Sequence, residues 1–367
     1  MMRRLIPLAA ALLGLSACGT VQAADESRVQ TGGAAPIDAA LVTSGFGWVL
    51  TSDRLLLTTD GGARFSEARP PVPVTDARAA HFTDAMNGYV AASDGDGITT
   101  ARTADGGRTW TTATLRDPSA PAEYGRLRTA FRDAAHGAVL AQTSATAMSS
   151  AATLFTTDDG GATWSARRAP VSGEVALEPS GRIWVAGGVA GDRLSFTTDQ
   201  GRHWTDAKTQ LNGSIDTKAI APPVDGVLPV TVVDGSDRTQ VALLTSTDQG
   251  RSWRESRDRI DVHGRTGPGV RIPVAPSTGG LLVVDTAGSH AYRVPSREPA
   301  SDVRPTGLPE GADAVTFAPG GRTGWTLATY GRCTKGKTGC TLYHPLLTTT
   351  DGGATWRQLR MWQQRLN

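Results

Sequence analysis

The sequence has almost no net charge and very little lysine. It carries 37 Lys and Arg against 35 Asp and Glu in 367 residues, and its only lysines are Lys208, Lys218, Lys335 and Lys337. Loss of Arg3 and Arg4 with an export signal would leave the two signs balanced. A near-neutral chain offers no electrostatic attraction for nucleic acid or for an anionic membrane surface. Neither is therefore expected as a partner.

The sequence also lacks the usual signatures of metal and nucleotide chemistry. Its six histidines show no metal-ligand spacing, and it contains neither a Gly-x-Ser-x-Gly elbow nor a phosphate-binding loop. We therefore expect no metal and no cofactor.

Long apolar runs are absent except near the N-terminus, where Leu5 to Leu13 follows Arg3 and Arg4. This run is too short to span a membrane as a stable helix, and it has the form of an export signal. The next residues, Leu15-Ser16-Ala17-Cys18, resemble a bacterial lipobox. The resemblance implies a signal peptide over residues 1–18, a lipid on Cys18, and an exported chain anchored to the outer face of the bacterial cytoplasmic membrane.

An ordinary cleaved signal ending near Ala23-Ala24 is the alternative, because Val21-Gln22-Ala23 also has the small-x-small form. Residues 19–36 are small and polar and are expected to form a flexible tether. The rest of the chain, residues 37–367, shows no break in composition and is predicted to be a single domain.

Cysteine is scarce, with three in the whole chain. If Cys18 carries lipid, Cys333 and Cys340 remain as the only pair. Because an exported protein meets oxidising conditions, we expect these two to form a disulfide that closes the Gly-rich loop between them.

An eight-residue pattern, Ser/Thr-x-Asp-x-Gly-x-x-aromatic, occurs six times and organises the chain. Its aspartates are Asp60, Asp105, Asp159, Asp199, Asp248 and Asp351. Asp accepts hydrogen bonds from backbone N–H groups a few residues on, and Gly supplies a positive φ, so each copy is predicted to be a hairpin turn between short apolar strands. A repeat of about 40–50 residues is typical of a solenoid or a propeller.

The pattern resembles the Asp-box, or bacterial neuraminidase repeat, of β-propellers. In that family the aspartates are structural and lie away from the central funnel. The last two aromatics of the pattern are separated by about twice the usual spacing, which indicates a degenerate repeat. We assign Val270 to Val274 and Leu281 to Val284 to its first two strands, and Asp285-Thr286-Ala287-Gly288 to its nearest approach to a turn. The prediction is an all-β, seven-bladed propeller of four-stranded antiparallel blades, with six or eight blades as alternatives.

The second strand of several repeats matches a narrower group. Gly47-Trp48-Val49, Gly88-Tyr89-Val90 and Gly324-Trp325-Thr326, with the turns that follow them, are similar to the propellers of photosystem II assembly and stability factors. Those relatives are not enzymes and act by holding other proteins. The resemblance implies a non-catalytic, monomeric scaffold that binds a protein or glycan at the cell surface. Most of the nine tryptophans follow the repeat, so we expect them in the core.

A sialidase-like glycoside hydrolase is the alternative function. Val270-Arg271-Ile272-Pro273 resembles the Arg-Ile-Pro motif of sialidases, in which the Arg grips the substrate carboxylate. Tyr124 with Glu123 is the nearest match to the nucleophile pair of those enzymes, although neighbours on a strand point to opposite faces. In sialidases the motif lies in the first blade, whereas here it lies in the sixth.

Any ligand site is expected opposite the repeat turns, where the longer connections lie. The candidate ligand face consists of Tyr124, Arg126, His263, Arg265 and Arg271. The loop closed by Cys333 and Cys340 is predicted to form a rigid rim beside it.

Overall fold

The computed structural model describes most of the chain from Val29 onward. The described residues are 29–31, 34–74, 78–93, 97–119, 123–143, 151–213, 215, 217–233, 238–256, 258–262, 272–286, 290–295, 299–333 and 340–366. Their regular secondary structure is entirely β, as the repeat pattern predicted. A search of these residues finds no helix with the length and apolar character needed to cross a membrane.

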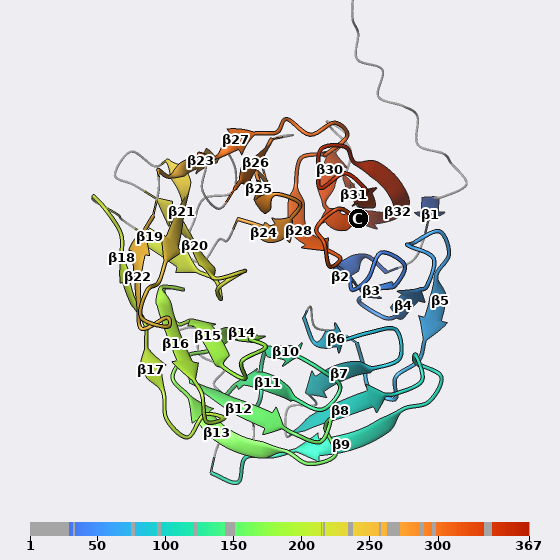
Figure 1. The fold of residues 1–367 in the computed structure, drawn as a ribbon. Helices are drawn as coiled ribbons and strands as arrows, with labels where there is room; N and C mark the ends of the chain where they lie inside the picture. Colours follow the sequence, from blue (N-terminus) through green and yellow to red (C-terminus); the bar gives the residue numbers. More distant parts are fainter. Residues whose placement is uncertain are drawn as a thin grey trace, which may run out of the picture.

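Seven sheets are arranged radially around a central axis, which confirms the seven-bladed propeller (Figure 1). The strands of each blade follow the chain from the axis outward. Blade 1 contains β2 (Pro36–Leu41), β3 (Gly47–Thr51), β4 (Leu55–Thr58) and β5 (Ser66–Ala68). Blade 2 contains β6 (Ala80–Phe82), β7 (Gly88–Ser93), β8 (Ile98–Thr103) and β9 (Thr111–Leu115). Blade 3 contains β10 (Leu127–Phe131), β11 (Gly137–Gln142), β12 (Ala152–Thr157) and β13 (Ser165–Ala169).

The remaining blades keep this order with additions at their edges. Blade 4 contains β14 (Gly173–Leu177), β15 (Ile183–Gly187), β16 (Arg193–Thr197) and β17 (Thr205–Asp206). Blade 5 contains β19 (Thr217–Ile220), β20 (Val227–Val233), β21 (Thr239–Thr245) and β22 (Ser252–Glu255), with β18 (Lys208–Gln210) and β23 (Ile260–Val262) paired to it. Blade 6 contains β24 (Val274–Ser277), β25 (Gly280–Val284), β26 (Ala291–Val294) and β27 (Ser301–Asp302). Blade 7 contains β28 (Ala312–Phe317), β29 (Gly324–Ala328), β31 (Cys340–Thr349) and β32 (Arg357–Leu366), with β30 (Tyr330–Cys333) paired to β31.

The core lies in the seams between blades, because each blade is covered on both faces by its neighbours. The second strands β3 and β15 are therefore buried at every position, and they read as continuous apolar runs rather than alternating ones. The described tryptophans also lie in or beside these seams: six are buried, and Trp110, Trp164 and Trp204 are half-buried. They pack between sheets and form no exposed aromatic platform.

Each copy of the eight-residue pattern forms the turn between the third and fourth strands of its blade. The Ser or Thr hydroxyl donates to the Asp carboxylate at 2.8–2.9 Å and accepts the N–H of the glycine at the fifth position of the pattern at 2.7–3.0 Å. That glycine has φ between 83° and 96° in all six copies, a conformation that a Cβ would strain.

These repeat turns share one face of the ring with the turns between first and second strands. Gly61 N–H donates to the Gly45 carbonyl at 2.7 Å, and Gly160 N–H donates to the Ala135 carbonyl at 2.7 Å. The opposite face, which we call the loop face, therefore carries the connections from strand two to three and from blade to blade.

Blade 6 corrects two details of the sequence interpretation. Its first strand is Val274–Ser277 rather than Val270 to Val274, whereas its second strand, Gly280–Val284, contains the predicted Leu281 to Val284. Asp285 follows the second strand, so it lies on the loop face and not at a repeat-turn position. The Asp-to-Gly spacing was misleading, because the repeat turns follow a third strand whereas Asp285 follows the second.

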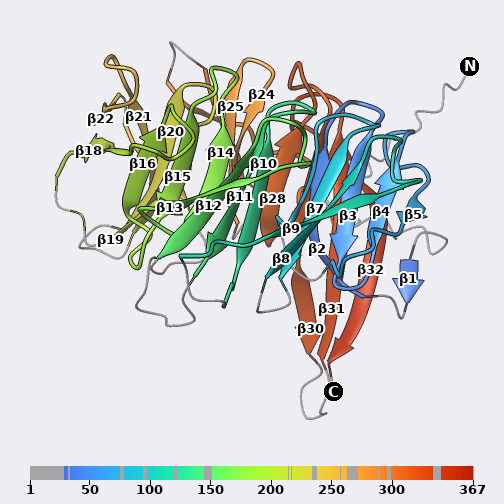
Figure 2. The same ribbon diagram turned by 90° about the horizontal axis from the view of Figure 1, so that it is seen from below.

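The first strand of the described chain joins the last blade. β1 (Val29–Thr31) pairs in parallel with Met361–Gln363 of β32, so the N-terminal segment adds an outer strand to blade 7. Figure 2 shows β30, β31 and β32 extending beyond the other blades, with the C-terminus at their tip.

Candidate functional site: an axial cavity

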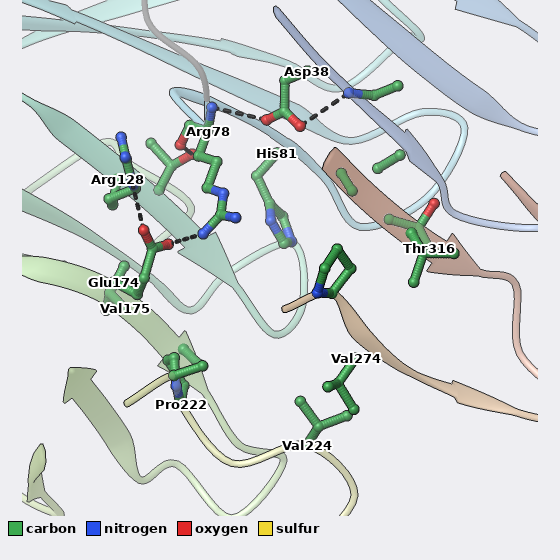
Figure 3. Close-up of a pocket in the computed structure, with 18 of the residues that line it drawn as sticks. Asp38, Arg78, His81, Arg128, Glu174, Val175, Pro222, Val224, Val274 and Thr316 are labelled. Carbon is green, nitrogen blue, oxygen red and sulfur yellow. Dashed lines mark hydrogen bonds and ion pairs between the residues drawn. The ribbon is translucent and has the colours of Figure 1, made fainter. Parts of the chain in front are cut away.

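A cavity of about 420 Å³ lies on the propeller axis and is lined by residues from all seven blades. Its two sides differ in chemistry. Blades 1 to 4 contribute the charged or titratable side chains Asp38, Arg78, His81, Arg128 and Glu174. Blades 5 to 7 contribute mostly apolar ones, and in Figure 3 Pro222, Val224 and Val274 lie across the cavity from this charged group.

Arg78 stands at the centre of the charged side, and its backbone is held from two neighbouring blades. Asp38 of β2 accepts the Arg78 N–H at 2.8 Å. Thr129 of β10 donates both its N–H and its hydroxyl to the Arg78 carbonyl, at 3.0 and 3.1 Å. These bonds maintain a φ of 63°, which is unfavourable for a residue with a Cβ. Backbone strain of this kind, fixed by surrounding structure, is typical of functional sites.

The guanidinium of Arg78 points to Glu174 of β14, which also binds Arg128 of β10. One Glu174 oxygen accepts from Arg78 Nη1, and the other accepts from Arg128 Nε at 3.2 Å (Figure 3). The side chains of Arg128 and Glu174 are only 14% and 13% exposed, whereas that of Arg78 is 52% exposed. Glu174 therefore anchors a guanidinium that still has surface open to the cavity.

The pKa values follow from burial and from the neighbouring charges. Desolvation raises the pKa of Asp38, although Arg78 and the N–H groups that it accepts work in the opposite direction. Desolvation also disfavours the charge on Arg78, but Glu174 and Asp38 outweigh it and raise the pKa of Arg78. Burial lowers the pKa of His81 to about 4, so this ring is neutral at pH 7. The cavity thus presents a fixed cation, Arg78, beside a neutral imidazole.

The structure describes two of the five predicted ligand residues, Tyr124 and Arg126. Tyr124 is buried, its ring packs against Phe155, and its hydroxyl accepts the Asp117 N–H at 3.0 Å. Arg126 is exposed on the loop face, outside the cavity lining. His263, Arg265, Arg271 and Cys18 lie outside the described residues, but Ile272 and Pro273, which follow Arg271, line the axial cavity.

One feature of the sequence indicates this site, namely charged residues in the first strands of the blades. Asp38, Arg128 and Glu174 are charged residues near the start of first strands, within short segments that are otherwise small or apolar. Because first strands line the axis of a propeller, aligning the repeats on their first strands would have brought these charges together.

The backbone also places Cys333 directly opposite Cys340 in the β30–β31 pair. Directly paired strand residues have Cα atoms about 4.5–5.5 Å apart, within the range of about 4.4–6.8 Å that a disulfide requires. The disulfide itself stays a prediction.

No protein-family model matches the chain, and no curated protein sequence matches it. Solved structures are similar to it in fold. The lectin BP39L from Burkholderia pseudomallei is 15% identical, with a TM-score of 0.54 over 90% of this chain and 99% of the lectin. The virginiamycin B lyase from Staphylococcus aureus is 13% identical, with a TM-score of 0.50 over 80% of this chain and 91% of the lyase. A structure of YCF48 bound to a D1 peptide is 17% identical, with a TM-score of 0.45 over 89% of this chain and 81% of that one.

The fold and the cavity define a seven-bladed β-propeller with a half-charged, half-apolar site on its axis. A lectin and a lyase have similar folds, so the fold alone does not decide between binding and catalysis.

Proposed function

We propose that this propeller is a non-catalytic binding scaffold that holds a protein or glycan partner at the axial cavity, with a protein segment as the favoured occupant. The observation that carries the proposal is Arg78: a strained, half-exposed arginine fixed by Asp38, Thr129 and Glu174 at the centre of the ring. A half-exposed guanidinium suits a partner carboxylate or backbone carbonyl. The apolar side, which includes Val224 and Val274, suits an aliphatic side chain of the same segment.

The carboxylates of the site favour binding over catalysis. Glu174 bridges two arginines, and Asp38 accepts the N–H groups of Arg78 and Ala39. Both groups are occupied in holding the site together, which is a role of support rather than of proton transfer.

The test is site-specific photocrosslinking with the full chain in the cells that produce it. A crosslinker at Val175, which lines the cavity, is expected to capture one defined partner, and Arg78→Gln should abolish that capture. The same crosslinker at Met86, which is 45% exposed on the face of the repeat turns, is the control and should not capture it. Equal capture from both positions, or capture unaffected by Arg78→Gln, would contradict the proposal.

Export and lipid anchoring on Cys18 belong to the same proposal. They would place the scaffold at the outer face of the bacterial cytoplasmic membrane, where cell-surface partners lie. The lipobox resemblance of Leu15-Ser16-Ala17-Cys18 supports them.

A sialidase-like hydrolase is the second candidate, favoured by the position of Ile272 and Pro273 in the cavity lining. Against it, the Tyr124 hydroxyl is buried and hydrogen-bonded in the core. Hydrolysis of a fluorogenic sialoside, alongside a panel of other glycosides, separates the two functions. Turnover that is lost in Arg271→Ala would establish the hydrolase, whereas a folded protein without turnover would leave binding as the function.

A further inference from the structure

A second pocket, of about 450 Å³, lies in the seam between blades 3 and 4 on the face of the repeat turns. Its walls come from the turns of both blades. Arg132, His136 and Asp158 belong to blade 3, and Gly181 and Gln200 belong to blade 4. None of these residues lines the axial cavity, so the seam pocket is a separate site.

One position in the repeat contributes to this hollow, the residue just before the Ser or Thr of the pattern. In blade 1 this residue is Leu57, which reaches the turn of blade 2: a Cβ at Gly107 would lie 3.2 Å from its Cδ1. In blade 2 it is Arg102, which reaches the turn of blade 3: a Cβ at Gly160 would lie 2.8 Å from its Cζ.

Blade 3 has the shorter Thr156 at this position, and Thr156 lines the seam pocket. The seam between blades 5 and 6 also has a threonine at this position. Its corresponding residue is Thr245, which lines a cavity of about 250 Å³. The lining of that cavity is mainly aliphatic, including Val227, Leu281 and Val294, so the seam pocket of blade 3 is the more polar of the two.

Hydrogen bonds fix the polar groups of the seam pocket. Asp133 accepts from Arg132 Nε at 3.3 Å and pairs with His136 Nδ1 at 2.8 Å. The Arg132 guanidinium lies over Gly181, where a Cβ would be 2.8 Å from its Nη1. The side chains of Arg132 and His136 in blade 3 are therefore held in fixed positions by one carboxylate.

The repeat turns of the two blades supply the remaining polar groups of the pocket. Gln200 Nε2 donates to an Asp158 oxygen at 2.6 Å, which links the repeat turns of the two blades across the pocket. Among the described residues, the Thr156 hydroxyl is buried and has no hydrogen-bond partner. Because Thr156 lines the pocket, a substitution at this position alters the pocket without breaking a described hydrogen bond.

We propose that the seam pocket binds a neutral sugar residue or similar polyol. Donors from Arg132 and acceptors from Asp158 and Gln200 surround one small polar space, and a sugar hydroxyl both donates and accepts. An anionic ligand fits less well, because Asp133 already compensates Arg132 and Asp158 adds negative charge. The site is independent of the partner proposed for the axial cavity.

Saturation-transfer NMR and calorimetry with the purified full chain test this binding, using galactose, glucose, mannose, fucose and N-acetylglucosamine as probes. A site with a few hydrogen bonds and no aromatic wall predicts a dissociation constant on the order of 0.1–1 mM. Gln200→Ala removes one polar wall and is expected to weaken binding roughly tenfold. Gln249→Ala is the matched control, because Gln249 has the same place in the blade 5 turn and a similar φ, 59° against 61°.

Thr156→Leu provides a second test that does not remove a polar wall. It places in blade 3 the side chain that fills the equivalent seam of blade 1, and it should abolish sugar binding while the protein remains folded. Binding unchanged in Thr156→Leu and Gln200→Ala, or no binding of any probe at concentrations well above the expected constant, would overturn the proposal.

Discussion

At the scale of the residue, one aspartate closes each repeat turn. Asp351 accepts from the hydroxyls of Thr349 and Thr355, at 2.8 and 2.5 Å, and from the N–H groups of Ala354 and Thr355, at 3.0 and 2.9 Å. These bonds lower the pKa of Asp351 against the effect of desolvation. One carboxylate therefore serves as the acceptor for two hydroxyls and two backbone N–H groups of the turn.

Asp351→Ala is expected to destabilise the propeller by about 1–2 kcal/mol, because the turn loses these bonds and the N–H groups lose their acceptor. Urea denaturation monitored by tryptophan fluorescence measures the change. Thr350→Ala is the control, since Thr350 is exposed in the same turn and lies outside the hydrogen bonds that Asp351 accepts; its effect should stay within about 0.5 kcal/mol. Equal losses in the two variants would contradict a structural role for the repeat aspartate.

His81 gives the fold a pH dependence at the axis. Burial lowers the pKa of His81 from 6.5 to about 4. Between these two pH values the imidazole is therefore protonated in the unfolded chain and neutral in the folded protein. Stability should be highest above pH 6.5 and should fall by about 1–3 kcal/mol as the pH drops to 4. Denaturant midpoints measured across this range test the point. His81→Gln should flatten the curve between pH 4 and 6.5, whereas an unchanged slope would show that another group is responsible.

At the scale of the element, the β30–β31 hairpin depends on a predicted crosslink. Cys333 and Cys340 occupy directly paired positions near its end. Closing so short a loop is expected to stabilise the hairpin by about 2–3 kcal/mol relative to the reduced chain. Mass spectrometry after thiol alkylation, with and without prior reduction, detects the bond. Hydrogen exchange at Tyr330–Cys333 should rise in Cys340→Ser; labelling of both cysteines without reduction would show that the bond does not form.

Elements with strong local signals were predictable, and those without them were not. The six repeat turns are fixed by interactions within eight residues, so their sequence pattern is sufficient to find them. Blade 6 lacks the pattern, and its first strand was placed four residues too early. The β1–β32 pair joins residues more than 300 positions apart, so no pattern within one repeat could reveal it.

At the scale of the whole molecule, the candidate site is a product of ring closure. Asp38, Arg78, Arg128 and Glu174 come from four blades and meet only because their first strands converge on the axis. The residues predicted from the sequence lie in long loops instead. One of them, Tyr124, was expected at the ligand face, but its ring fills the core beside Phe155. Burial of a tyrosine next to a loop depends on packing that local sequence does not encode.

The anchor determines where this ring would meet its partner. If Cys18 is lipidated, ten residues separate it from β1, and a fully extended segment of that length spans at most about 35 Å. The β1 edge of blade 7 would then stay close to the membrane.

Cys18→Ser is expected to move the protein from the membrane fraction to the soluble fraction and to abolish incorporation of a labelled fatty acid, because no acyl chain remains to partition into the bilayer. Ser16→Ala, which leaves the cysteine in place, should remain membrane-bound. A Cys18→Ser protein that still fractionates with membranes would favour attachment through a bound partner over a lipid.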